Sequence, residues 1–101
     1  MAIEVINPAT EEVTGRYKEM SQVELETIIT DMAQEQKEWL KTSFSQRKEL
    51  MLKAADVIRA HADEYARIIT EEMGKPITQA LGEVIKCAEL CEYYATTAEN
   101  Y

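Results

Sequence analysis

Apolar residues recur at the 3.6-residue spacing of an α-helix over most of the chain beyond residue 20. The pattern is interrupted at residues 42–45, which read Thr-Ser-Phe-Ser, and again at 74–76, which read Gly-Lys-Pro. Glycine readily adopts the left-handed conformation that ends a helix, and proline cannot continue one. The sequence therefore predicts three helices, over residues 21–41, 45–73 and 76–101.

The first predicted helix has a clear start. Ser21 and Glu24 have the spacing of a capping box, and Met20 and Leu25 occupy the two positions of a hydrophobic staple. The last helix has no comparable end, because neither Gly nor Pro follows its apolar stripe and no basic residue complements its dipole. We therefore expect it to run to Tyr101, and we expect the chain to be part of a larger protein.

Residues 3–20 have the pattern of a β-hairpin. A β-prone run, Ile3-Glu4-Val5-Ile6, is followed by the turn-forming pair Asn7-Pro8 and then by a second β-prone run that starts at Val13. An isolated hairpin is only marginally stable in water, so this one needs a surface on which to pack. The predicted fold is mainly α, an N-terminal hairpin followed by three long helices, with one apolar flank left for a missing partner.

Length and charge limit the function classes. A chain of 101 residues is expected to form one domain, and its 11 basic and 19 acidic residues give a net charge of −8. The basic residues form no stripe that could follow a phosphate backbone, so nucleic-acid binding is not expected. No apolar run has the length of a membrane span, and the first 20 residues lack the pattern of a secretory signal. We expect a cytoplasmic protein without a membrane partner.

The residues with reactive side chains form no catalytic motif. His61, the only histidine, lies among charged residues and is expected at the surface. Glu71 and Glu72 are adjacent on a helix and diverge by about 100°, which is unsuitable for a paired acid and base. Cys87 and Cys91 are four residues apart, a poor geometry for a disulfide, and are expected to be reduced and at least partly buried. We assign no catalytic residue and no cofactor-binding residue in this chain.

Three stretches together resemble the N-terminal segment of the aldehyde dehydrogenase superfamily. The first, Asn7-Pro8-Ala9-Thr10-Glu11, is similar to the opening hairpin of that family, although Glu11 stands where the family most often has Gly. The second is Trp39 followed by Arg47, similar to the Trp and Arg that bracket the first interhelical loop. The third is Glu72-Met73-Gly74-Lys75-Pro76, followed at a matching distance by Tyr93-Tyr94-Ala95. The resemblance covers essentially the whole chain but only a minor, N-terminal part of a family member.

The resemblance implies a parent enzyme that oxidises an aldehyde to the carboxylic acid with NAD or NADP. In the family a cysteine thiolate attacks the aldehyde, and a glutamate activates the water that hydrolyses the thioester. The nucleophile lies in a Gly-Gln-x-Cys setting that neither Cys87 nor Cys91 matches. The chain is therefore expected to be an incomplete piece of the α/β aldehyde dehydrogenase fold, the N-terminal segment of its cofactor-binding domain, without activity or bound cofactor of its own.

The same stretches look most like bacterial succinate-semialdehyde dehydrogenases, which implies succinate semialdehyde as the substrate of the parent enzyme. The expected partners are the remainder of the fold or a second copy of this chain, and the parent is expected to be a homo-oligomer. An alternative stays open, because long amphipathic helices also form interfaces. In that interpretation the chain is a free-standing helical interaction or oligomerisation module derived from this segment.

The resemblance also implies one candidate ion site. Family members often hold a sodium or potassium ion where the opening hairpin meets the end of the second helix. Carried over by motif, the ligands in this chain are the backbone carbonyls of Val5 and Ile6 together with Glu72. Hard cations prefer oxygen ligands, and the C-terminal end of a helix offers unpaired carbonyls. At least one further ligand is expected from the part of the fold that lies outside this chain.

Overall fold

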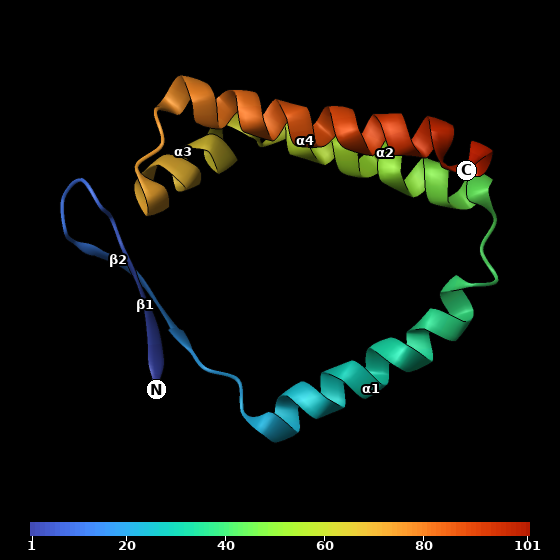
Figure 1. The fold of residues 1–101 in the computed structure, drawn as a ribbon, viewed down its shortest axis with the longest axis horizontal. Helices are drawn as coiled ribbons and strands as arrows, with labels where there is room; N and C mark the ends of the chain where they lie inside the picture. Colours follow the sequence, from blue (N-terminus) through green and yellow to red (C-terminus); the bar gives the residue numbers. More distant parts are fainter.

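The computed structural model describes residues 1–101 and confirms a mainly helical chain that begins with a β-hairpin. Two strands are followed by four α-helices and a short 3₁₀ turn (Figure 1). In chain order these are β1 Ala2–Ile6, β2 Val13–Lys18, α1 Gln22–Trp39, α2 Phe44–Ala60, α3 Ala62–Met73, α4 Ile77–Thr97 and the 3₁₀ turn η1 Ala98–Asn100.

The hairpin is antiparallel and turns through the predicted Asn-Pro segment. The Asn7 side chain accepts a hydrogen bond from the Ala9 amide at 2.9 Å, which is the local bond that makes asparagine a turn residue. Glu11 has a φ of 62°, the only positive φ outside glycine. The register between the two strands shifts from Val5 to Ile6 on β1, and Ile6 pairs with Val13 of β2.

Serine capping boxes start the first two helices. Ser21 and Glu24 make both reciprocal contacts of the predicted box at the start of α1. Ser43 and Gln46 make the same pair of contacts at the start of α2, so that helix begins at Phe44. Both boxes satisfy amides that have no partner inside the helix.

The prediction of one continuous helix over 45–73 is wrong. The helix bends at His61, whose φ of −108° and ψ of 16° lie outside the helical region, and α2 and α3 are separate helices. No Gly or Pro marks this position, so the apolar period continues across it. The bend accompanies tertiary packing, because Ala62 and Ala66, just beyond it, are buried in one cluster with Ala80 and Val84 of α4.

The predicted stop after α3 is confirmed, whereas the last helix ends earlier than expected. Gly74 adopts the left-handed conformation, with a φ of 73°, and its amide donates to the Thr70 carbonyl. The final helix was expected over 76–101, but α4 ends at Thr97 and residues 98–100 tighten into the 3₁₀ turn. Tightening of a last turn is common at helix ends.

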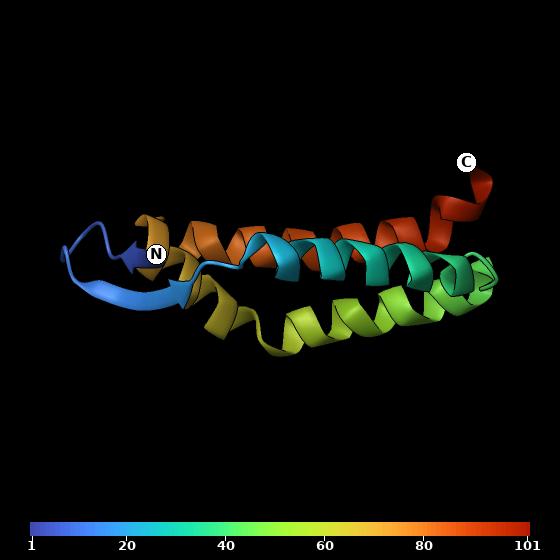
Figure 2. The same ribbon diagram turned by 90° about the horizontal axis from the view of Figure 1, so that it is seen from below.

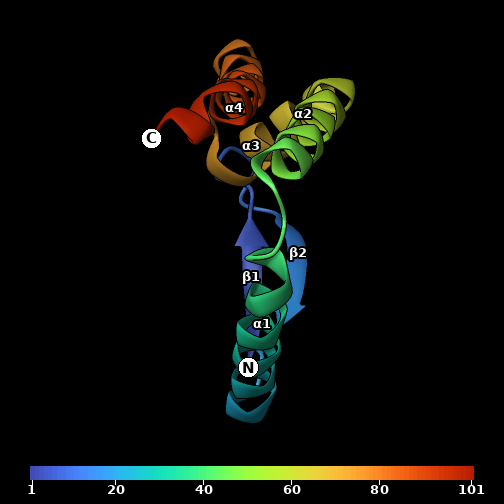
Figure 3. The ribbon, with the colours of Figure 1, turned by 90° about the vertical axis from the view of Figure 1, so that its right-hand side faces the viewer.

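Helix α4 runs alongside both α2 and α3. The three helices form a layer, which we call the helix layer and define as residues 44–97. Helix α4 packs against α2 and against α3, while α1 packs extensively on no element. Figures 1 and 3 show α2 and α4 side by side, with the hairpin and α1 extending away from them. Viewed from below, in Figure 2, the whole chain is flat. We call residues 1–39 the N-terminal arm.

The core of this layer is small. Only six residues are buried, and all are alanine or valine: Ala55, Ala62, Ala66, Ala80, Val84 and Ala88. Small side chains allow the helices to approach closely, but they bury little apolar area. The radius of gyration is 17.7 Å, whereas a compact domain of this length has about 13 Å.

Candidate functional site

The residues with reactive side chains are dispersed in the structure. His61 is exposed at the junction of α2 and α3, where its Nδ1 lies 3.0 Å from Glu64 and its ring stacks on Tyr65. Glu71 and Glu72 are exposed in the last turn of α3. No group of three or more His, Cys, Asp or Glu side chains could hold a metal ion together.

Both cysteines are free thiols, and one of them is more accessible than expected. Cys91 is half-buried, in line with the prediction that both thiols are at least partly buried, but Cys87 is exposed, so the prediction is wrong for that residue. The buried small residues of α4 are Ala80, Val84 and Ala88, and Cys87 precedes the last of them by one position, which places it about 100° away around the helix.

The hairpin turn lies against the end of α3. A Cβ built on Gly74 would come within 3.1 Å of the Pro8 side chain, so these two residues are in close contact. Figures 1 and 2 show the hairpin turn beside the connection between α3 and α4. The contact brings the segments that carry the candidate ion ligands together, with Val5 and Ile6 just before Pro8 and Glu72 two residues before Gly74.

The connection after Gly74 is itself held by charge. The Lys75 ammonium lies 2.7 Å from the Glu83 carboxylate of α4, and the Lys75 side chain is only 26% exposed. Pro76 precedes α4 and its carbonyl accepts from the Gln79 and Ala80 amides. These contacts tie the connection to the start of α4.

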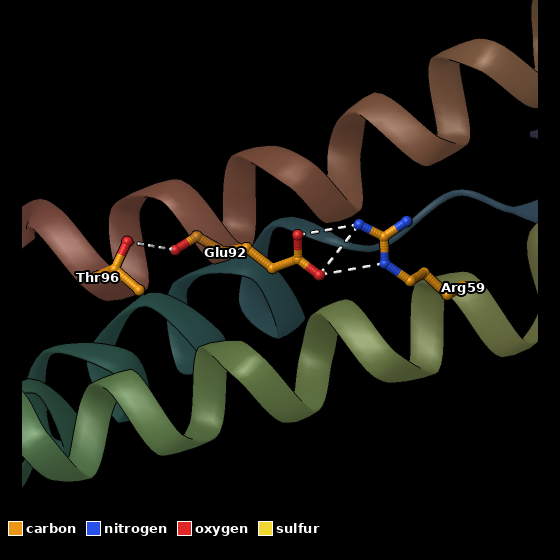
Figure 4. A network of polar contacts seen from close by, with 3 residues as sticks. All are labelled: Arg59, Glu92 and Thr96. Carbon is orange, nitrogen blue, oxygen red and sulfur yellow. Dashed lines mark hydrogen bonds and ion pairs between the residues drawn. The ribbon is translucent and has the colours of Figure 1, made fainter.

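A second polar contact joins α2 to α4. Arg59 donates to both carboxylate oxygens of Glu92, with the closest contact at 2.9 Å (Figure 4). This hydrogen bonding raises the pKa of Arg59 above its ordinary value. The partners are 33 residues apart in the sequence. No local pattern in the sequence pairs them, so only the structure shows this contact.

The third polar contact lies where α1 meets α2. The Arg47 Nε donates to the Thr42 hydroxyl at 2.8 Å, and Nη2 donates to the Trp39 carbonyl at 2.9 Å. The guanidinium carbon also lies 5.2 Å from the centre of the Trp39 ring and 5.8 Å from that of Phe44. The Trp39 and Arg47 of the sequence resemblance are thus in direct contact.

Large apolar side chains are exposed along the whole molecule. No residue of α1 is buried, and its stripe of Leu25, Ile28, Ile29 and Met32 is 41% to 66% exposed. The apolar face of α1 is therefore not covered within this chain. The expected free apolar flank is present.

The total accessible surface of the chain is also larger than that of a compact monomer. The chain has an accessible surface of 8063 Å², whereas a compact monomer of its mass exposes about 5,800 Å². One hollow of about 430 Å³ lies between the end of β2 and the start of α1, lined in part by Met20, Val23 and Ile28. None of the helices combines the length and hydropathy needed to cross a lipid bilayer.

Comparison with known proteins places the whole chain in one family. The profile of the aldehyde dehydrogenase family matches residues 1–101. A probable succinate-semialdehyde dehydrogenase (NADP+) of Synechocystis is 44% identical over all of this chain and 22% of its own length. A succinate semialdehyde dehydrogenase (NAD(P)+) of Escherichia coli is 38% identical over 89% of this chain and 20% of its own length.

Solved structures show the same arrangement of elements. A succinic semialdehyde dehydrogenase from Streptococcus pyogenes, in complex with NADP+, superposes with a TM-score of 0.90 at 34% identity, over 96% of this chain and 22% of its own. An aldehyde dehydrogenase from Brucella melitensis superposes with a TM-score of 0.94 at 33% identity, over 99% and 21% respectively. The chain spans about a fifth of the length of these proteins. The chain therefore belongs to the aldehyde dehydrogenase family, of which it represents the N-terminal segment.

Proposed function

We propose that this chain is the N-terminal segment of the cofactor-binding domain of an NADP-dependent dehydrogenase that oxidises succinate semialdehyde to the dicarboxylic acid. The observation that carries the proposal is the 44% identity, over the entire chain, to a relative named for that substrate and cofactor. The NADP+ complex of the Streptococcus pyogenes structure supports the choice of cofactor.

The role of this chain in such an enzyme is structural. Its exposed stripes on α1 and its hairpin supply apolar surface to the remainder of the fold, and burial of such surface is the main favourable term in domain assembly. The excess of exposed area over a compact monomer, about 2,200 Å², has the size of a permanent interface. We propose that the remainder of the fold covers it and that the complete enzyme is a cytoplasmic homo-oligomer.

The chain alone is expected to be catalytically inactive and to bind neither NAD nor NADP. The family's nucleophilic cysteine, its glutamate base and its cofactor loop all lie outside the matched segment. The two cysteines present lie on α4, and the only histidine contacts Glu64 and Tyr65 rather than either thiol.

A chimera tests the proposal directly. The matched segment of the Synechocystis relative is replaced by this chain, and NADP-dependent oxidation of succinate semialdehyde is measured. We expect activity within the same order of magnitude as that of the relative, and none from the chain alone. A soluble, folded chimera without activity would contradict the proposal, as would turnover by the pure 101-residue chain.

We also propose that the hairpin turn and the end of α3 share a monovalent cation in the complete enzyme. The Val5 and Ile6 carbonyls and the Glu72 carboxylate would be its oxygen ligands, and the negative end of the α3 dipole favours a cation there. The close contact of Pro8 with Gly74 supports this placement. The proposed ligands are all oxygen atoms, which would suit sodium or potassium.

The cation site is tested in the same chimera by thermal unfolding. Replacing choline chloride by sodium or potassium chloride at constant ionic strength should raise the melting temperature. The Glu72→Gln variant should lose that increase, while Glu71→Gln, a neighbouring exposed carboxylate, should keep it. An equal response in both variants would remove Glu72 from the site.

A further inference from the structure

The N-terminal arm is attached to the helix layer at two small points. One is the contact of Pro8 with Gly74, and the other is the segment between Trp39 and Arg47. Between these points the hairpin and α1 make no extensive packing with the helix layer, and Figure 1 shows an open frame. The direction of the N-terminal arm is therefore determined mainly at these two points.

Apolar packing at the second point is incomplete. A cavity of about 220 Å³ lies there, lined in part by Trp39, Phe44, Met51, Tyr94 and Ala95. Trp39 and Phe44 are 43% and 47% exposed, so neither ring is locked in a core. Close packing cannot fix an angle where the side chains leave such a space.

The polar contacts at the same point converge on Arg47. Its guanidinium, on α2, binds the Trp39 carbonyl in the last residue of α1 and the hydroxyl of Thr42 in the connecting segment. It also lies close to the rings of Trp39 on one side of the connection and Phe44 on the other. A cation at the C-terminal end of α1 interacts favourably with the helix dipole. The Trp39 carbonyl also accepts from the Thr42 amide and hydroxyl, so Arg47 adds a third, charged donor to a carbonyl at the helix end.

We infer that Arg47 is a positioning residue that sets the angle between the N-terminal arm and the helix layer. Arginine is suited to this task, because its planar group donates in several fixed directions while its face lies over aromatic rings. Lysine has one compact charge and cannot make both kinds of contact in one geometry. This role concerns the chain itself and does not depend on the substrate or cofactor of the complete enzyme.

The angle can be measured with two spin labels in the 101-residue chain. One label is placed at an introduced cysteine, Asp31→Cys, on α1, and the other at the native Cys87 on α4, in a Cys91→Ala background. Both labelled positions are exposed. Labelled chains are diluted with unlabelled chain, so that the measured distances are intramolecular. With Arg47 in place, we expect one narrow distribution of distances between the two labels.

The Arg47→Met variant keeps an unbranched side chain but should lose the narrow peak, and Arg47→Lys should broaden it. The matched control is Lys48→Met, which removes the same charge one residue later, where no hydrogen bond to the arm exists, and should leave the peak unchanged. Circular dichroism checks that the helix layer remains folded in each variant. A narrow peak in Arg47→Met, a broad one in the unsubstituted chain, or an equal loss in Lys48→Met would overturn the inference.

The single tryptophan gives an independent readout. Trp39 lies under Arg47, so its fluorescence anisotropy reports on the ring that the guanidinium holds. The anisotropy should fall in Arg47→Met and stay unchanged in Lys48→Met. Because this measurement needs no label, it remains available if the cysteine substitutions disturb the fold, and an unchanged anisotropy in Arg47→Met would contradict the inference.

Discussion

Glu11 has a side chain in a backbone conformation that favours glycine. Its φ of 62° lies in the left-handed region of backbone conformation, where the Cβ of an L-residue is crowded at a cost of about 1–2 kcal/mol. The sequence resemblance has Gly at this position, and the structure supplies the physical reason. The chain tolerates Glu11 because the turn is held by two backbone bonds, from Asn7 to the Glu12 carbonyl and from Glu11 to the Asn7 carbonyl.

The first prediction is that Glu11→Gly stabilises the hairpin by about 0.5–1 kcal/mol, the steric gain less the entropy of glycine. The measurement is amide hydrogen exchange at Asn7, whose N–H bonds to Glu12 at 2.9 Å. Glu12→Gly is the control. Because the φ of Glu12 is not positive, glycine there should weaken the turn, and the Asn7 amide should lose protection. Slower exchange in Glu12→Gly than in Glu11→Gly would contradict this account of the turn.

The second prediction compares two glycines. Gly74→Ala should destabilise the helix layer by about 1–2 kcal/mol, because a Cβ at positive φ is strained. The new methyl group would also lie within 3.1 Å of Pro8. Gly82→Ala should instead stabilise α4 by about 0.5–1 kcal/mol, since a Cβ there meets nothing within 4 Å. Urea unfolding followed by circular dichroism measures both, and two changes of the same sign would refute the argument.

At the level of the helices, the two serine capping boxes differ in the residue three positions after the serine, which is Glu24 in one and Gln46 in the other. Glu24 accepts bonds from the Ser21 hydroxyl and amide, and these lower its pKa below the ordinary value of 4.5. A lowered pKa means that the bonds stabilise the folded state above the unfolded pKa and are lost as pH falls through the folded one. Gln46 makes the equivalent contacts with Ser43 and has no charge to lose.

The third prediction follows from that difference. In a pH titration followed by NMR, the Ser21 amide proton should shift with a midpoint below 4.5, while the Ser43 amide should not respond in that range. Glu24→Gln should remove the response of Ser21 and preserve the box, as Gln46 does in α2. A Ser21 midpoint at or above the ordinary carboxyl value would contradict the assignment.

The predictability of each element depends on how local its cause is. Ser21 and Gly74 mark helix ends through bonds within a few residues, so the sequence was sufficient for both. The bend at His61 has no such signal, because neither Gly nor Pro occurs there and the apolar period continues through it. Packing of Ala62 and Ala66 on α4 accompanies the bend, and a single sequence does not show which alanines will meet.

At the level of the whole molecule, the contacts that cross between helices were the least predictable. Arg59 and Glu92 come together because α2 and α4 are neighbours, a fact that neither residue's surroundings in the sequence indicate. For the candidate ion site, the motif suggested that Val5, Ile6 and Glu72 belong together. The structure adds the contact of Pro8 with Gly74 between the segments that carry them.

The last prediction concerns the exposed apolar stripe of α1. Its side chains remain 41% to 66% exposed within the chain, and the total surface exceeds that of a compact monomer by about 2,200 Å². Exposed apolar patches of this kind bind hydrophobic dyes and drive association. We expect the isolated chain to self-associate or to bind such a dye, as measured by sedimentation and by dye fluorescence.

A pair of variants shows whether α1 is responsible. Ile28→Lys places a charge on the stripe, beside the hollow that Ile28 lines, and should reduce both dye binding and association. Gln34→Lys adds the same charge at an exposed polar position of the same helix and should change neither. If the unsubstituted chain were instead a monomer that melts cooperatively and binds no dye, its stripe would need no partner. That result would favour the free-standing module over a segment whose apolar surface belongs to the interior of a larger dehydrogenase.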